Sequence, residues 1–205
     1  MPRTFAILEP MLVFTLIMTY IWKLRFVNGN LWMVILAVML LSHALRRETP
    51  AKLGFGLHNL RGCVHELAPA LTLLALVLLA GGILLRSTRQ IGFDRELVAL
   101  ALYVPWGVAQ QYALNGYFLN RLDGLLSRRA APAVTAALFS CAHTPNWFLM
   151  VVTLLLGYCA TLVYRRYRNL YFLGMAHAAV GFLLFLVVPD SISHHLIVGP
   201  GWFRR

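Results

Sequence analysis

Long apolar runs are the feature of this sequence that most limits its fold. Hydrophobic residues make up 60% of the 205 positions and charged residues only 12%, whereas charged residues are about a quarter of an ordinary soluble domain. A helix needs roughly 20 apolar residues to cross the hydrocarbon core of a bilayer, and several runs approach or reach that length. The sequence therefore predicts an all-α, polytopic bundle of transmembrane helices that forms one integral membrane domain, residues 1–205.

Seven segments have this apolar character, so we expect about seven membrane helices, or eight. The stretch 52–66 has apolar residues at helical spacing, and it forms either an interfacial helix or the first turns of the third membrane helix. The stretch 189–205 contains two prolines and two glycines, so it is not a regular helix throughout and is expected to return to the membrane surface. The seven segments cover residues 4–22, 30–45, 66–85, 92–122, 130–143, 145–164 and 169–188.

The basic residues lie mainly in short connectors between the apolar runs. A net charge of +11 would suggest a nucleic-acid partner in a soluble protein, but this chain has no nucleic-acid-binding motif. Lys and Arg in connectors are typical of topology signals and of contacts with anionic lipid head groups. If the chain crosses the membrane seven times, the side of the membrane that holds the N-terminus carries most of the 18 Lys and Arg residues. The positive-inside rule then predicts a cytoplasmic N-terminus.

Polar residues inside the predicted helices mark the candidate site, because polar groups in lipid are costly and usually functional. Gln111 and Asn115 are four residues apart and therefore share a helical face. An imidazole in the middle of a membrane helix needs a partner, and His177 is expected to find Gln111 or His143. Acidic residues, Glu9 excepted, fall in connectors or near helix ends, so the interior is expected to hold almost no carboxylate. The polar stretches are AQQYALNGYF (109–118), FSCAHTPNW (139–147) and MAHAAVG (175–181).

The order of these stretches resembles the CAAX-protease and bacteriocin-processing family of glutamic intramembrane proteases, whose pattern is EExxxR, then FxxxH, then HxxxN on successive core helices. The matching segments are QQYALN (110–115), FSCAH (139–143) and HAAVG (177–181). The resemblance spans roughly residues 90–190 and leaves residues 1–89 as additional N-terminal helices. It implies a central polar cavity built around Gln110, Gln111, His143 and His177, with Asn115, Phe139, Asn146 and Tyr112 in its walls.

The departures from the family pattern bear directly on activity. In the family, a glutamate activates water while the histidines and the asparagine orient it and stabilise the oxyanion. Here Gln110 and Gln111 stand for the two glutamates, Asn115 for the arginine and Gly181 for the asparagine. A carboxamide does not accept and hold a proton near neutral pH. Losing a general base commonly lowers a rate by about 10²–10⁴-fold.

Three hypotheses follow for the function. The first is a non-proteolytic member of a bacterial inner-membrane complex, a binding or structural subunit that contacts the lipid bilayer and a membrane-protein, peptide or lipid-like partner. The second is an active peptidase in which His143 or His177 is the base and glutamine donates to the oxyanion. The third is a pigment-binding subunit in which His43 ligates a tetrapyrrole metal.

The second hypothesis has a metal variant, and the polar residues also have a purely structural interpretation. Zinc would be ligated by His143 and His177, with His194 or His195 folding back, although catalytic zinc normally has three protein ligands. In the structural interpretation, Gln110 and Gln111 only bridge neighbouring helices, which polar side chains do in membrane bundles at about 0.6–2 kcal/mol each.

Overall fold

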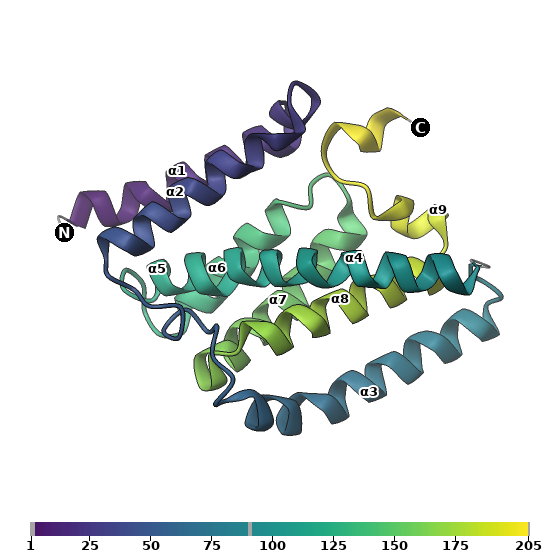
Figure 1. Ribbon diagram of the computed structural model, residues 1–205. Helices are drawn as coiled ribbons and strands as arrows, with labels where there is room; N and C mark the ends of the chain where they lie inside the picture. Colours follow the sequence, from purple (N-terminus) through teal and green to yellow (C-terminus); the bar gives the residue numbers. More distant parts are fainter. Residues whose placement is uncertain (1–2, 90–91, 205) are drawn as a thin grey trace.

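In the part of the chain that the structure describes, seven helical rods correspond to the seven apolar runs. A computed structural model describes residues 3–89 and 92–204 (Figure 1), and no strand occurs in those residues. The fourth rod is continuous but changes its winding, because α4 (Phe93–Gln111) passes into a π-helix, η3 (Tyr112–Leu119), and then into α5 (Asn120–Leu122). The remaining rods are α1 (Arg3–Trp22), α2 (Trp32–Leu45), α3 (Leu60–Leu84), α6 (Ala130–Cys141), α7 (Trp147–Tyr167) and α8 (Leu170–Val187).

The architecture confirms the predicted all-α helical bundle. The third helix begins at Leu60, so residues 60–66 are its first turns and residues 52–59 form a loop rather than an interfacial helix. Within the described residues, four helices are long and apolar enough to cross a membrane, whereas the segments 29–45 and 130–141 are shorter. The exposed faces of these helices are rich in Leu, Val and Trp, as expected for lipid contact. The exact number of crossings stays a prediction.

The connectors gather alternately at two opposite ends of the bundle. At one end, the Tyr164 hydroxyl donates to the Leu53 carbonyl at 3.0 Å, and Arg165 contacts Asp123 and the Arg128 carbonyl. At the other end, Arg25 donates to the Val198 carbonyl at 2.8 Å. Figure 1 shows the same division into two ends. Such alternation is what a chain that runs back and forth through a bilayer requires.

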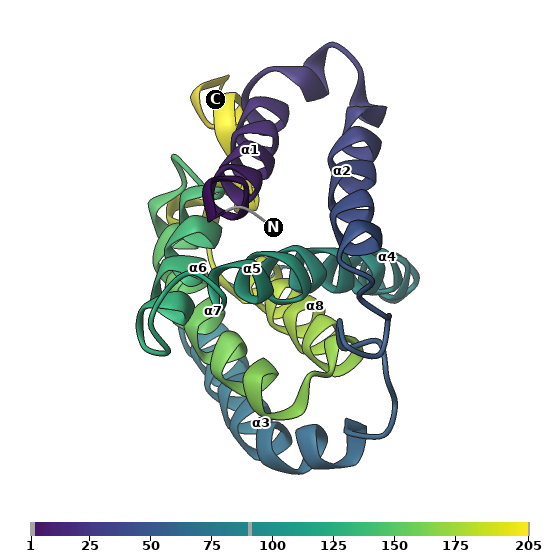
Figure 2. The same cartoon turned by 90° about the vertical axis from the view of Figure 1, so that its left-hand side faces the viewer.

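The fourth rod lies in the middle of the molecule and positions the polar residues. In both views α1 and α2 lie on one side of this rod and α3 on the opposite side (Figures 1 and 2). The rod crosses α8 at a pair of glycines. A Cβ atom on Gly174 would lie 2.7 Å from the Cα atom of Val108, and a Cβ on Gly107 would collide with the Gly174 carbonyl oxygen. Small residues allow this close approach of two backbones, which brings Gln111 beside His177.

The last described residues fold back onto the turn between α6 and α7. A short helix, α9 (Asp190–Ser193), is followed by 3₁₀ turns, as the prolines and glycines there predicted. The Asn146 side chain accepts from Leu149 N–H at the start of α7 and donates to the Ser193 carbonyl at 2.9 Å. Gly199 N–H donates to the Thr144 carbonyl at 2.8 Å. This segment therefore braces the turn that carries His143.

Candidate intramembrane polar site

Gln111, Asn115 and His177 form a hydrogen-bonded row between the fourth rod and α8. Asn115 Nδ2 donates to Gln111 Oε1 at 2.7 Å, and Gln111 Nε2 lies 3.2 Å from His177 Nδ1. Asn115 is fully buried and Gln111 nearly so. Because an amide nitrogen donates and never accepts, His177 Nδ1 is the acceptor and the proton of this neutral ring is on Nε2. The expected partnership between His177 and Gln111 is confirmed.

Phe139 lies between the two histidines of the site. Its ring makes edge contacts with His143 and His177, at centroid distances of 4.9 and 6.0 Å. His143 Nδ1 lies 2.7 Å from the Phe139 carbonyl oxygen, which only accepts. His143 therefore carries its proton on Nδ1 and keeps a lone pair on Nε2. The two rings have opposite tautomers, so the site combines one imidazole acceptor with one imidazole donor. We refer to Gln111, Asn115, Phe139, His143 and His177 as the amide–imidazole cluster.

Other predicted site residues lie outside this cluster. Gln110 is half-buried, and its side chain makes no hydrogen bond with the described residues. Tyr112 faces the opposite way, with its ring 5.8 Å from that of Phe55 and 5.7 Å from that of His43. Asn146 is fully buried and serves as the α7 cap. The residues that the sequence analysis assigned to one site therefore point to different parts of the bundle.

The two C-terminal histidines considered as zinc ligands are engaged elsewhere. The ring of His194 stacks on Trp202 at 3.8 Å, and His195 Nε2 lies 2.7 Å from an Asp190 oxygen. Among the described residues, no group of three or more His, Cys, Asp or Glu side chains is placed to hold a metal ion. Two imidazoles alone fall short of the usual three protein ligands of catalytic zinc, so the donor set does not fit a zinc site.

A second polar group, which the sequence did not reveal, surrounds Arg121 at the other end of the same rod. Arg121 Nε donates to Glu9 Oε1 at 3.0 Å, and its two terminal nitrogens lie 2.9 and 2.8 Å from the oxygens of Glu48. Ser42 and Arg46 also contact Glu9, and the Tyr117 hydroxyl donates to Glu9 at 3.1 Å. We call Glu9, Ser42, His43, Arg46, Glu48, Tyr117 and Arg121 the ionic cluster.

The ionic cluster is buried at its centre, around Arg121 and Glu9, and is electrically balanced. Arg121 is only 5% exposed and Glu9 only 8%. Two carboxylates face two guanidinium groups, so the cluster is neutral when His43 is neutral. Burying charges is expensive unless each has an opposite partner and hydrogen bonds, and here every charged group has both. Glu9 was the one signal of this cluster in the sequence. A lone carboxylate inside a predicted membrane helix requires a cationic partner, and Arg121 is a cation inside the apolar run 92–122.

His43 belongs to this ionic cluster. Its Nδ1 atom lies 2.6 Å from Glu48 Oε2, and its ring packs against the rings of Tyr112 and Tyr117 at 5.7 and 5.8 Å. The imidazole is 3% exposed. A tetrapyrrole needs a broad open face beside its axial ligand, so this placement lends the pigment hypothesis no support.

Glu48 makes the stability of the protein depend on pH. Burial raises the pKa of this carboxyl, but the hydrogen bonds from Arg121 and His43 and the charge of Arg121 outweigh burial and lower the pKa below its usual 4.5. The stabilisation by ionised Glu48 is therefore complete above the unfolded-state pKa and is lost as the pH falls through the folded-state pKa. We expect the melting temperature in detergent to fall as the pH drops below 4.5. The variant Glu48→Gln should show a shallower fall, and an unchanged slope would contradict this assignment.

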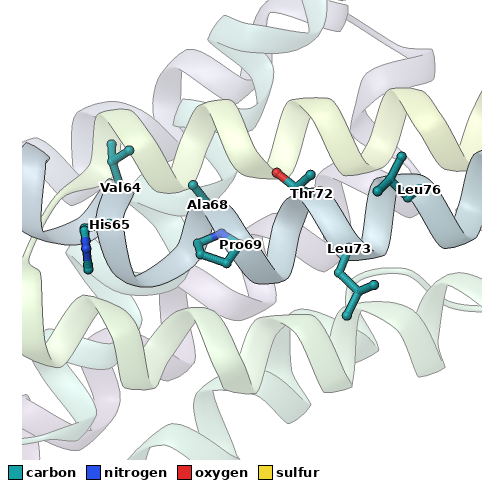
Figure 3. A pocket seen from close by; sticks show the side chains of 7 residues that line it. All are labelled: Val64, His65, Ala68, Pro69, Thr72, Leu73 and Leu76. Atoms are coloured by element: carbon teal, nitrogen blue, oxygen red, sulfur yellow. The ribbon is translucent and has the colours of Figure 1, made fainter.

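A surface groove runs along α3, away from both clusters. Figure 3 shows the side chains that line it, of which only His65 and Thr72 are polar; the others are Val64, Ala68, Pro69, Leu73 and Leu76. It contains none of the predicted site residues. The amide–imidazole cluster is therefore the better candidate for a specific site, because it brings convergent polar groups together inside the bundle.

Comparison with known proteins bears on residues 94–183. This segment matches the family model described as type II CAAX prenyl endopeptidase Rce1-like. No curated protein and no solved structure gives a significant match. The matched segment runs from the fourth rod to α8 and contains every member of the amide–imidazole cluster. Residues 94–183 of this integral membrane protein are therefore similar to the type II CAAX prenyl endopeptidases, as the order of the polar motifs predicted.

Proposed function

We propose that this protein binds a partner inside the membrane without cleaving it, as a binding or assembly subunit of a membrane complex. One observation carries the proposal: both polar atoms of the Gln111 amide are engaged, one by Asn115 and the other by His177. In the family resemblance, this part of the helix supplies the glutamate that activates water. An amide with two neutral partners is suited to holding a polar group in place and has no capacity to take up a proton.

The carboxylates of the ionic cluster do not replace the missing base. Glu9 and Glu48 are held by Arg121, which follows Gln111 by ten residues along the rod. Ten residues of helix correspond to roughly 15 Å, too far for a carboxylate to act on water bound at His177. This separation supports a function in binding.

A histidine-based peptidase is the second candidate, and the tautomer of His143 favours it. The Nε2 lone pair of His143 is an acceptor beside a neutral donor, His177. An imidazole has an intrinsic pKa suited to proton transfer. The two candidates differ in one measurable respect, because only the peptidase turns over a substrate.

For localisation we propose a bacterial cytoplasmic membrane with the N-terminus on the cytoplasmic side. The connectors that meet near Leu53, Asp123 and Arg165 lie at one end of the bundle, and with the N-terminal side they hold most of the basic residues. The positive-inside rule assigns that end to the cytoplasm.

The variant Gln111→Ala tests the binding function. Removing the amide leaves the buried Asn115 and His177 groups without their partner, and an unsatisfied buried polar group costs about 1–3 kcal/mol. We expect the amount of the bound partner that is retained through purification in mild detergent to fall about tenfold or more. Gln110→Ala is the matched control, because it removes the same side chain one residue away from a half-buried position, and it should leave retention unchanged.

The same preparations distinguish the two candidates. The purified wild-type protein is incubated with a library of prenylated and unprenylated membrane peptides, and products are measured by mass spectrometry. No turnover, together with partner loss in Gln111→Ala alone, supports the binding subunit. Cleavage that disappears in His143→Ala would establish the peptidase and reject a purely binding role. Equal retention in the Gln110 and Gln111 variants would reject the amide–imidazole cluster as the binding site.

A further inference from the structure

Two arginines that are far apart in the sequence share one aromatic ring. Arg25 lies in a 3₁₀ turn, η1 (Leu24–Phe26), that follows α1, and Arg204 is the last residue of the 3₁₀ helix η5 (Gly199–Arg204). The Cζ atoms of the two guanidinium groups lie 4.8 and 5.0 Å from the centre of the Phe26 ring, so the two cations are neighbours. In both views the C-terminal segment lies beside the end of α1 (Figures 1 and 2). We call Arg25 and Arg204 the arginine pair.

The backbone of the C-terminal segment holds Arg25 in place. Its Nη2 atom donates to the Val198 carbonyl at 2.8 Å. The chain passes close to the guanidinium, since a Cβ atom on Gly199 would lie 3.4 Å from the same Nη2. A guanidinium has five N–H donors, and Arg25 makes no other hydrogen bond with the described residues. The group is therefore fixed and keeps donors for a ligand.

No acid accompanies the arginine pair. The sequence has no Asp or Glu in residues 10–47 or 191–205. Neither arginine forms an ion pair among the described residues, whereas Arg89 and Arg165, which lie near other connectors, each contact an aspartate. Two neighbouring guanidinium groups repel each other, and an anion close to both removes this repulsion. The arginine pair carries a charge of +2 and is complementary to an anion from outside the chain.

Exposed apolar side chains place the arginine pair at the level of the lipid head groups. Val27 is 81% exposed, Phe203 68% and Phe26 49%. Trp202, beside Phe203, is of a residue type that is enriched at membrane interfaces. The pair also lies at one end of the helical rods, where the connectors gather (Figure 1). The anion that every phospholipid offers at this depth is its phosphate group, which arginine binds through two parallel hydrogen bonds.

We propose that Arg25 and Arg204 bind the phosphate group of an anionic phospholipid. A zwitterionic head group brings its own ammonium into a region of positive charge, so a lipid of net negative charge is favoured. The bound lipid fastens the C-terminal segment, whose Gly199 N–H donates to the Thr144 carbonyl in the turn that carries His143. This role is the same whether the amide–imidazole cluster binds a partner or cleaves one, so its test is independent of the proposed function.

The variant Arg204→Gln tests the lipid site, because Arg204 is exposed and its replacement leaves the bond between Arg25 and Val198 in place. The full chain is purified in mild detergent, depleted of lipid and titrated with phosphatidylglycerol, and lipid adducts are measured by native mass spectrometry. We expect the affinity for this lipid to fall about tenfold in Arg204→Gln. The matched control is Arg86→Gln, which removes an exposed cation from the connector between α3 and α4 and should leave the affinity unchanged.

Equal affinities of Arg204→Gln and Arg86→Gln would overturn the proposal. Phosphatidylcholine that binds the wild-type protein as tightly as phosphatidylglycerol would overturn the preference for an anionic head group. Inorganic phosphate separates a lipid from a free anion, because a ligand of the native state raises the melting temperature. An increase as large as that caused by phosphatidylglycerol would reject the lipid as the ligand. Arg25→Gln should also weaken lipid binding, and if it unfolds the C-terminal segment, the comparison of Arg204→Gln with Arg86→Gln decides.

Discussion

The variant Arg121→Met should lower the free energy of unfolding by about 3–5 kcal/mol, the usual effect of removing one partner of a buried ion pair. Methionine is apolar and unbranched like the stem of arginine, so the main change is the loss of the charge. Glu9 and Glu48 would then remain close together with much less neutralisation. The measurement is unfolding in mild detergent by titration with dodecyl sulfate.

Two further variants separate this charge effect from lost packing. Arg166→Met removes the cation of a surface pair with Glu66, in which the arginine side chain is 68% exposed, and such pairs contribute only about 0–1 kcal/mol. The double variant Arg121→Met, Glu48→Gln removes the surplus carboxylate together with the arginine and keeps the pair of Glu9 with Arg46. We expect it to recover most of the lost stability, because buried ion pairs are often replaceable by neutral groups. No recovery would show that the guanidinium acts through shape alone.

Gly174→Ala should be a strongly destabilising single-methyl change in the segment 94–183. The added Cβ would lie 2.7 and 2.9 Å from the Cα and N atoms of Val108, and a backbone has no rotamer by which to avoid it. Overpacking typically costs 1–3 kcal/mol, and we expect a loss of about 3 kcal/mol in the same titration. Since Gly174 precedes His177 by less than one turn, the separation of the helices should also break the contact between Gln111 and His177.

Gly81→Ala is the matched control for the crossing of α4 and α8. Gly81 also lies inside a long helix, but a Cβ there would meet nothing within 4 Å. Alanine in a helix interior is favoured over glycine by roughly 0.5–1 kcal/mol, so this variant should be neutral or slightly more stable. Equal losses in Gly81→Ala and Gly174→Ala would contradict the close crossing as the cause.

The helices could be predicted from the sequence because every segment that spans the lipid must be a long, mostly apolar helix. The predicted run 92–122 corresponds to a rod over residues 93–122, and the run 169–188 to α8, Leu170–Val187. Spacing also paired Gln111 with Asn115, and the expense of an unpaired imidazole pointed from His177 to Gln111. These predictions succeeded because each depends on local geometry or on one strong energetic rule.

The sequence could not separate Gln110 from Gln111, or reveal the ionic cluster. Neighbouring helical residues point about 100° apart, so only one glutamine faces His177, and the choice depends on the rotation of the whole rod. Glu48 lies in a connector, where charges are ordinarily solvated. Its attachment to Arg121 depends on how α2 leaves the bundle, which no local pattern encodes.

The position of Glu9 in the first helix has a consequence for the order of assembly during synthesis. Its partners Ser42 and Arg46 follow by 33 and 37 residues, whereas Arg121 follows by 112. A charged group inside a membrane helix opposes insertion, by about 2.5–3.5 kcal/mol where it lies at the helix centre. Because the ribosome delivers α2 long before α5, the hairpin of α1 and α2 can neutralise its own acid as it enters the bilayer. Arg121 then joins a unit that is already inserted, and its arrival marks the docking of that unit onto the rest of the bundle.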